Sequence, residues 1–272
     1  MSAVGAGQGA IPPLLLVGCG QMGGAMLAGW REQGLDPSVV VDPSAAPDAP
    51  GGHRFVPSLD DVPEGFRPAL VVLAVKPQTA AAVLPALSRF GSAPVLSVMA
   101  GWTVAGLEGL LGRPGVVRAM PNTPAAIRQG MSVAFAGAGV DAEARALCDR
   151  LLRSVGAVAW VDEEAMLDAV TAISGGGPAY VFLLAELLER EGVAHGLPPA
   201  LARELARRTV SGSGALLAAR DQDAAVLRQA VTSPRGTTER ALAVLMAPPA
   251  WPALLHEAVG AAIERARALA AG

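Results

Sequence analysis

Residues 231–238, Val-Thr-Ser-Pro-Arg-Gly-Thr-Thr, place hydroxyl side chains on both sides of a proline and a glycine. Arg235 is the only strong acid or base among them, and the apolar-periodic run Ala241–Leu245 follows, so we expect a helix to begin at the end of this stretch. Free backbone N–H groups and the positive end of a helix dipole favour an anion there, typically a carboxylate or a phosphate. An ordinary cap between two helices has the same composition, so the stretch by itself leaves both interpretations open.

A second candidate site lies near the amino end, where the apolar run Leu14–Val17 leads into Gly18-Cys19-Gly20-Gln21-Met22-Gly23 and a helical pattern at Ala25–Trp30. An unbroken apolar strand indicates burial on both faces, as in a parallel sheet covered by helices. In a dinucleotide-binding fold, Gly18 would permit the tight turn, Gly20 the approach of a pyrophosphate, and Gly23 close packing of the helix. The order strand, glycine loop and helix predicts a nucleotide site, with a tight turn in an unliganded sheet as the alternative.

The next strand, Val39–Val41, ends at Asp42, about twenty residues further on, where such a fold places its ribose-binding residue. A carboxylate accepts a hydrogen bond from a ribose 2′-hydroxyl and repels a 2′-phosphate, which favours NADH. The nearby Ser44 hydroxyl, beside an expected helix N-terminus, could instead hold the phosphate of NADPH. The sequence therefore predicts NADPH or NADH, and Asp42 favours NADH.

Further strands alternate with helical segments up to residue 162, and the pattern is helical from there to the end. This alternation predicts an α/β protein with a Rossmann-like doubly wound parallel sheet and right-handed crossovers. We expect a loose leader at 1–13, a dinucleotide-binding domain at 14–162 and an all-α substrate and dimerisation domain at 163–272. The further expected strands are Leu70–Val75, Val95–Val98, Val116–Met120, Ser132–Phe135 and Val158–Val161.

Three irregular segments follow strands and should lie at the carboxyl edge of the sheet, where ligands bind in such folds. They are Ala74-Val75-Lys76-Pro77, Met99-Ala100-Gly101 and Met120-Pro121-Asn122-Thr123-Pro124. Each is also compatible with an ordinary strand-ending loop, but their convergence on one edge favours a cofactor cleft. Lys76 carries the only ammonium group among them, to contact a phosphate or to support its loop.

The helical part is expected to begin with a helix at Asp162–Ile173, a break at Ser174–Pro178 and a helix at Ala179–Leu188. The last of these is apolar on nearly every side and should be buried in a core or an interface. We therefore expect at least a homodimer, formed through residues 164–272. This apolar stretch is too short to span a bilayer, so no membrane partner is expected.

Composition argues against several other classes of function. The net charge is −3 and the basic residues are scattered, which leaves no basic stripe for nucleic acid. Cys19 and Cys148 lie far apart and have no metal-ligand spacing, so we expect no metal site and a reduced, cytoplasmic protein. Residues 1–13 lack the positively charged region of a signal peptide.

Taken together, the motifs resemble the pyrroline-5-carboxylate reductase family over nearly the whole chain. The first matching block occurs in many dehydrogenases, but the last two together are close to diagnostic. This chain departs from the family pattern at Gly176, where a serine is usual, and at Arg235, where a glycine is usual. The matching blocks are residues 18–22, 74–77, 97–101, 117–124, 174–180, and 231–234 with 236–238.

The resemblance implies hydride transfer from the nicotinamide to a protonated cyclic imine that carries a carboxylate, with L-proline as product. It implies that the backbone amides of Gly236, Thr237 and Thr238 and the Ser233 hydroxyl hold the carboxylate. The Thr238 hydroxyl would face the ring nitrogen as the catalytic group, and Glu164 would lie near the substrate. In the family the substrate loop meets a cofactor domain at a dimer interface. The residues expected at the cofactor are Gly18, Cys19, Gly20, Gln21, Met22, Gly23, Asp42, Ser44, Ala74, Val75, Lys76, Pro77, Val98, Met99, Ala100 and Asn122.

Two other classes share parts of this pattern. The β-hydroxyacid dehydrogenases have a similar layout, but they use a catalytic lysine shortly after a glycine-rich motif like Ser174–Gly177, and Ala179–Leu188 contains none. A non-catalytic protein that binds a dinucleotide to sense redox state would need an output surface such as a basic recognition helix. The sequence shows no such helix.

Overall fold

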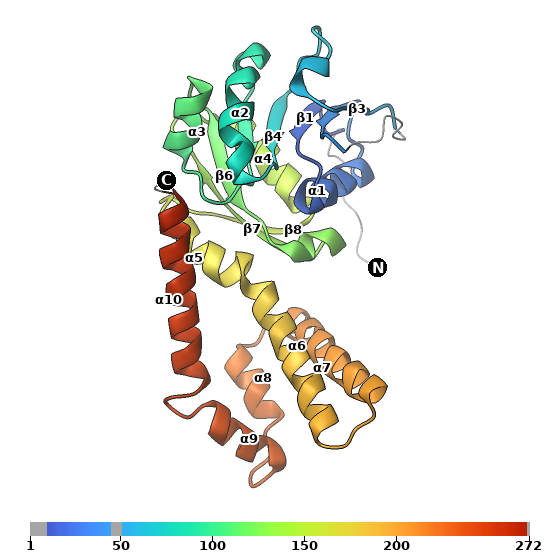
Figure 1. Cartoon of the computed structure of the whole chain (residues 1–272), viewed down its shortest axis with the longest axis vertical. Helices are drawn as coiled ribbons and strands as arrows, with labels where there is room; N and C mark the ends of the chain where they lie inside the picture. Colours follow the sequence, from blue (N-terminus) through green and yellow to red (C-terminus); the bar gives the residue numbers. More distant parts are fainter. Residues whose placement is uncertain (1–9, 45–50, 271–272) are drawn as a thin grey trace. The chain divides into compact units, whose positions relative to one another are not determined.

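The computed structural model describes residues 10–44 and 51–270. Within them, an eight-stranded sheet with helices on both faces is followed by a part that is entirely helical (Figure 1). Contacts between residues divide the chain into two units. The first unit contains the residues up to Gly175 and those from Ile263 onward, and the second unit is Gly176–Ala262. The domain boundary expected after residue 162 stays a proposal.

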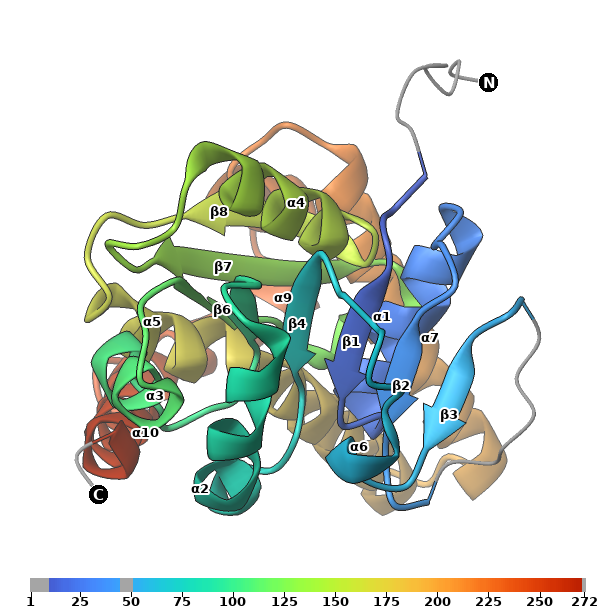
Figure 2. The same cartoon turned by 90° about the horizontal axis from the view of Figure 1, so that it is seen from above.

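The strands lie in the order β3-β2-β1-β4-β5-β6-β7-β8, which can be followed in Figure 2. Every described neighbouring pair is parallel except β6 and β7, which run antiparallel. The α/β class and the mostly parallel sheet are confirmed. Strand β7 runs against β6 because the link 121–129 is shorter than a parallel crossover requires, and β8 runs parallel to β7. The strands are β1 Leu14–Val17, β2 Val39–Val41, β3 Arg54–Val56, β4 Leu70–Leu73, β5 Val95–Ser97, β6 Val116–Met120, β7 Gly130–Ala136 and β8 Gly156–Trp160.

Alternate residues of the central strands enter two separate cores. Leu14 and Leu16 pack with α1 (Gln21–Glu32) and α4 (Ala142–Arg153) on one face. Leu15 and Val17 pack on the other face. The helices there are α2 (Ala80–Val83), the 3₁₀ segment η3 (Leu84–Phe90) and α3 (Val104–Leu111). This double burial explains the unbroken apolar strands of the sequence.

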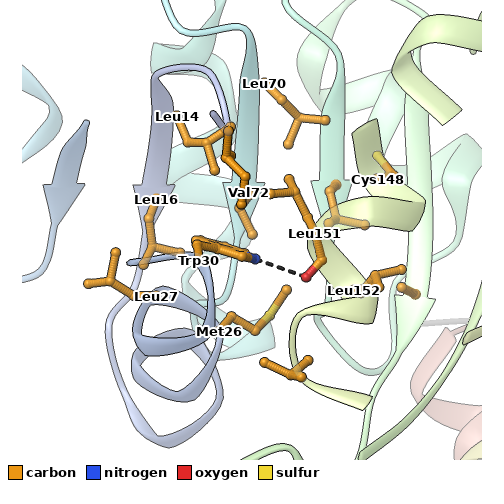
Figure 3. Close-up of a cluster of buried hydrophobic side chains, with 14 of the residues drawn as sticks. Leu14, Leu16, Met26, Leu27, Trp30, Leu70, Val72, Cys148, Leu151 and Leu152 are labelled. Carbon is orange, nitrogen blue, oxygen red and sulfur yellow. Dashed lines mark hydrogen bonds between the residues drawn. The ribbon is translucent and has the colours of Figure 1, made fainter. Parts of the chain in front are cut away.

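Trp30 of α1 is the largest fully buried side chain, and its indole Nε1 donates to the carbonyl oxygen of Leu151 in α4 at 2.9 Å (Figure 3). The bond joins two helices that cover the same face of the sheet. Cys148 lies in the same cluster, where burial and the nearby charge of Asp149 raise the pKa of its thiol to about 12. Cys148 is therefore a packed, protonated side chain with no reactive role at neutral pH.

The expected loose leader is wrong at its carboxyl end. Residues 1–9 lie outside the described residues, but Ile11 is fully buried and pairs with Leu35 in an isolated parallel bridge. The Ile11 N–H donates to the Gly34 carbonyl, and the Asp36 N–H donates to the Ile11 carbonyl. Ile11 therefore belongs to the core beside β1.

The expected break at 174–178 is also wrong. Helix α5 (Met166–Val170) passes through a π-helical turn, η5 (Thr171–Gly175), into α6 (Gly177–Ala194). Gly176 has right-handed helical angles, φ −80 and ψ −24, and Pro178 occupies the first turn of α6, where a missing N–H costs no helical hydrogen bond. The remaining helices are α7 Pro199–Ala219, α8 Ala224–Ala230, α9 Thr237–Leu245 and α10 Trp251–Ala270.

The helix across Met166–Ala194 is longer than the expected Ala179–Leu188. It is long and apolar enough to cross a membrane by length and composition, although one such helix is weak evidence for a membrane. Large apolar side chains of α6 are exposed in the single chain, with Phe182 at 66%. An exposed apolar surface of this kind is typical of an interaction site.

Candidate active site

The carboxyl ends of β1, β4, β5 and β6 lie side by side at one edge of the sheet, as the sequence predicts. The loops after β1, β4 and β5 contact one another. Gly18, with a positive φ of 93°, approaches the loop after β4 so closely that a Cβ atom would lie 2.6 Å from the Ala74 carbonyl oxygen. The Trp102 indole donates to the Pro77 carbonyl oxygen at 3.0 Å, which joins the loops after β4 and β5.

The glycine loop is closely packed at Gly18 and Gly23 and open at Gly20. A Cβ on Gly23 would lie 2.2 Å from the Gly18 carbonyl oxygen, so only glycine permits this packing of α1. A Cβ on Gly20 would meet no described atom within 4 Å. Gly20 caps α1 without a side-chain hydrogen bond, and no acidic residue lies in the first turn, so the helix presents its N–H groups to an open region.

The Asp42 side chain forms a hydrogen bond with the backbone of the glycine loop. Its Oδ2 accepts the Cys19 backbone N–H at 2.7 Å, and its Oδ1 accepts the Ser44 N–H at 2.9 Å and the Ser44 hydroxyl at 2.6 Å. Burial raises the pKa of Asp42, but these hydrogen bonds outweigh it and hold the pKa below its ordinary value. Burial and the Asp42 charge raise the pKa of the Cys19 thiol, which therefore stays protonated at neutral pH.

The other residues expected at the cofactor, in the loops after β4, β5 and β6, differ in how far they are buried and in what they contact. Lys76 is exposed, and its carbonyl accepts the Thr79 hydroxyl at 2.8 Å. Asn122 is partly buried, and its side chain accepts the Met131 N–H at 2.8 Å and donates to the Ser174 hydroxyl at 3.3 Å. One amide atom of Asn122 therefore holds the backbone of β7, and the other contacts the side chain of Ser174. Val98, Met99 and Ala100 form the loop after β5, in which Met99 is buried.

Glu164 lies in a partly buried ion pair that the sequence did not reveal. Its Oε1 accepts from Arg118 Nη1 at 2.9 Å and from the Val104 N–H, at the start of α3, at 2.8 Å. The Arg118 side chain, on β6, is only 4% exposed. The available signal was an arginine inside an otherwise apolar strand, because a buried charge needs a partner. The expected contact of Glu164 with substrate stays a proposal.

The expected substrate loop belongs to the second unit and joins α8 to α9. The Gly236 N–H donates to the Ser233 carbonyl at 3.0 Å, which closes a turn with Pro234 and Arg235 at its centre. Arg235 has a positive φ of 62°, and its N–H donates to Glu239 Oε2 at 2.8 Å. Proline followed by a residue with positive φ is the type II arrangement, which explains the family's usual glycine here.

Helix α9 begins directly after this turn. Gly236 is its N-cap and makes no side-chain capping bond, and the side chains of Ser233, Thr237 and Thr238 are exposed. The first N–H groups of a helix have no carbonyl partner within it, so this end offers donors to an anion. The local geometry of residues 233–238 is therefore the one expected from their sequence.

Comparisons with known proteins place the chain in a family. A family model described as pyrroline-5-carboxylate reductase dimerisation matches residues 164–269. A pyrroline-5-carboxylate reductase of Pseudomonas aeruginosa is 38% identical over 266 residues, which cover 95% of this chain and 97% of that protein. One from Arabidopsis thaliana is 40% identical over 202 residues, which cover 74% of this chain and 72% of that protein.

Solved structures agree over almost the whole chain. A pyrroline-5-carboxylate reductase from Coxiella burnetii superimposes with a TM-score of 0.85 and 34% identity, covering 94% of this chain and 97% of that chain. A pyrroline carboxylate reductase from Plasmodium falciparum with NADP bound superimposes with a TM-score of 0.81 and 28% identity, covering 95% and 98%. The chain therefore belongs to the pyrroline-5-carboxylate reductase family of NAD(P)H-dependent oxidoreductases.

Proposed function

We propose that this protein reduces 1-pyrroline-5-carboxylate to L-proline, the last step of proline biosynthesis. The observation that carries the proposal is 38% identity to a named pyrroline-5-carboxylate reductase over 95% of the chain. The glycine loop and the turn before α9 supply the two kinds of site that the reaction needs, one for a dinucleotide and one for a carboxylate.

On the cofactor side, the N-terminus of α1 would hold the pyrophosphate, with Gly20 leaving room for its approach. When bound, NADPH or NADH supplies the hydride. Asp42 would contact the adenosine ribose with oxygens that already accept three hydrogen bonds, so it both shapes the loop and contacts the nucleotide. The relative from Plasmodium falciparum is described with NADP, which supports NADPH beside NADH.

On the substrate side, the backbone N–H groups of Gly236, Thr237 and Thr238 and the Ser233 hydroxyl would hold the carboxylate. The Thr238 hydroxyl would face the ring nitrogen and help to deliver its proton. A protonated imine is already electrophilic, so the protein has to position it and stabilise its charges. The absence of a strong acid or base on the exposed side chains of Ser233, Thr237 and Thr238 fits that requirement.

The active form is proposed to be a homodimer or a higher homo-oligomer. The family model over residues 164–269 is named for dimerisation, and these residues include the exposed apolar surface of α6, with Val181, Phe182 and Leu183. Burial of this surface against a second copy accounts for its composition without a membrane. We propose a cytoplasmic enzyme that binds neither membrane nor nucleic acid.

A β-hydroxyacid dehydrogenase is the closest alternative enzyme class. It would need a lysine in α6, whereas the only lysine of the chain is Lys76, in the loop after β4. A redox sensor would bind the dinucleotide and leave it unchanged.

One assay separates these functions. Purified protein is mixed with NADPH or NADH, and loss of the absorbance of the reduced nicotinamide is followed after addition of pyrroline-5-carboxylate, with proline identified by mass spectrometry. We expect substrate-dependent oxidation and stoichiometric proline. Absence of oxidation with both nucleotides, in a protein that binds them, would reject the reductase and favour the sensor.

A further inference from the structure

Arg118 is the most deeply buried charged side chain near the candidate cofactor site. It lies in the middle of β6, opposite Ser97 of β5 and Phe135 of β7. The side chain is 4% exposed, and its Nε atom is buried without a hydrogen-bond partner in the described part of the chain. A guanidinium in such a place is costly unless an opposite charge is fixed against it.

Glu164 supplies that charge, and one of its carboxylate oxygens accepts two hydrogen bonds. Oε1 accepts from Arg118 Nη1 at 2.9 Å and from the Val104 N–H at 2.8 Å. The first turn of α3 contains no acidic residue, although Thr103 caps the helix through the Gly106 N–H at 3.1 Å. Glu164 thus brings a negative charge to the N-terminus of α3 from 60 residues away in sequence.

The start of α3 is also the end of the loop that follows β5. That loop begins at Val98 and reaches Thr103 through Gly101, which has a positive φ of 74°. The Trp102 indole joins it to the Pro77 carbonyl at 3.0 Å. A shift of Val104 would therefore move two of the loops that line the carboxyl edge of the sheet.

We infer that Arg118 and Glu164 form a positioning pair, which holds the 98–101 loop in the conformation that binds the nicotinamide dinucleotide. Arg118 fixes the Glu164 carboxylate, and that carboxylate fixes the first turn of α3. The inference rests on the proposed cofactor site and differs from a substrate contact of Glu164, because it predicts an effect on the nucleotide in the absence of substrate. In this role Arg118 acts through its ion pair with Glu164 and not through a contact with a ligand.

The test measures the Kd of NADP⁺ and of NAD⁺ by calorimetry, on the full chain without pyrroline-5-carboxylate. Glu164→Ala removes both hydrogen bonds, whereas Glu164→Gln keeps a side-chain oxygen for the Val104 N–H and loses the charge. Arg118→Met removes the cation, and Arg118→Lys retains it. Glu163→Gln is the matched control, because that neighbouring carboxylate is exposed. Thermal unfolding monitored by circular dichroism accompanies each variant.

We expect Glu164→Ala to raise the nucleotide Kd by about tenfold or more, Glu164→Gln to raise it less, and Glu163→Gln to leave it unchanged. Arg118→Lys should recover part of the affinity lost in Arg118→Met. If Arg118→Met does not fold, the graded pair of Glu164 variants decides the question.

Three results would overturn the inference. A lower Tm with an unchanged nucleotide Kd in Glu164→Ala would make the pair merely stabilising. An unchanged Kd with a raised KM for pyrroline-5-carboxylate would make Glu164 a substrate ligand only. Failure of the wild type to bind either nucleotide would remove the cofactor site itself, and with it the proposed function.

Discussion

The backbone N–H of Cys19 donates to Oδ2 of Asp42 at 2.7 Å, across 23 residues of sequence. This bond ties the glycine loop after β1 to the end of β2, and it takes the Cys19 N–H away from any phosphate. The N–H groups left for a pyrophosphate are those at the start of α1. Asp42 therefore has a structural task in addition to its expected contact with the ribose.

Asp42 should make stability depend on pH. Its pKa in the folded protein is below its ordinary value, so the unfolded chain binds more protons in acid, and the stabilisation present at neutral pH is lost as the pH falls through the folded pKa. Asp42→Asn keeps an acceptor for Cys19 but loses the charge. We expect the deficit in unfolding free energy of Asp42→Asn, measured with urea, to be larger at neutral pH than at about pH 3. A deficit that does not change with pH would contradict this.

Three glycines in the glycine loop and the first turn of α1 should respond differently to alanine. Gly23→Ala would place Cβ 2.2 Å from the Gly18 carbonyl oxygen and should lower the free energy of unfolding by about 1–3 kcal/mol. Gly20→Ala meets open space, so unfolding should change little while the nucleotide Kd rises about tenfold or more. Gly24→Ala is the control, since its Cβ would be at 3.5 Å from the Cys19 carbonyl oxygen and within the helix. It should be neutral, or stabilising by up to about 1 kcal/mol. Equal nucleotide affinity in Gly20→Ala and wild type would contradict the proposed pyrophosphate site.

Arg235→Gly should stabilise the protein. The left-handed conformation of Arg235 costs a non-glycine residue about 1–2 kcal/mol, and the greater flexibility of glycine in the unfolded chain offsets about half of that. We expect a gain of up to about 1 kcal/mol in urea unfolding. Arg235→Ala removes the same guanidinium but keeps the strained backbone, so it should show no gain. Equal stability of the glycine and alanine variants would refute the strain.

Thr238→Ala should lower kcat/KM for pyrroline-5-carboxylate by about tenfold or more, the scale of a lost polar contact in the transition state. Thr237→Ala is the matched control, because its proposed role uses only the backbone N–H. Both side chains are exposed, so neither variant should change the Tm appreciably. A Thr238→Ala enzyme with wild-type kcat/KM would exclude the hydroxyl from the reaction.

Trp30→Phe should destabilise the first unit by about 2–3 kcal/mol, through a lost hydrogen bond to Leu151 and a cavity in a fully buried cluster. Trp251→Phe is the control, since Trp251 is 49% exposed and its replacement should cost less than about 0.5 kcal/mol. Urea unfolding of the two variants measures the difference. Equal losses of unfolding free energy in the two variants would mean that the hydrogen bond to Leu151 and the packing of Trp30 do not stabilise the protein.

Much of the fold could be predicted because its signals are local. The apolar runs at Leu14–Val17 and Val116–Met120 gave buried parallel strands. The glycines at 18, 20 and 23 were expected between a strand and a helix, and the structure places them there, with the close packing predicted for Gly18 and Gly23. The turn before α9 was equally local, because Pro234 and the start of α9 lie within a few residues of each other.

Other features could not be predicted, because they depend on residues far apart in sequence. The strand Arg54–Val56 is recognisable only through its pairing with β2. The glycines after Ser174 signal a break, yet the chain continues through a π-helical turn into α6.

By itself, the sequence determined most of the helices and strands and the position of the glycine loop, and it predicted the chemistry at 231–238, since each of these depends on neighbours along the chain. Tertiary structure alone decided that Glu164 meets Arg118 and Val104, and that Asp42 holds Cys19. A charged residue within an apolar strand indicates that an opposite charge is needed, but only the folded structure determines which residue provides that charge.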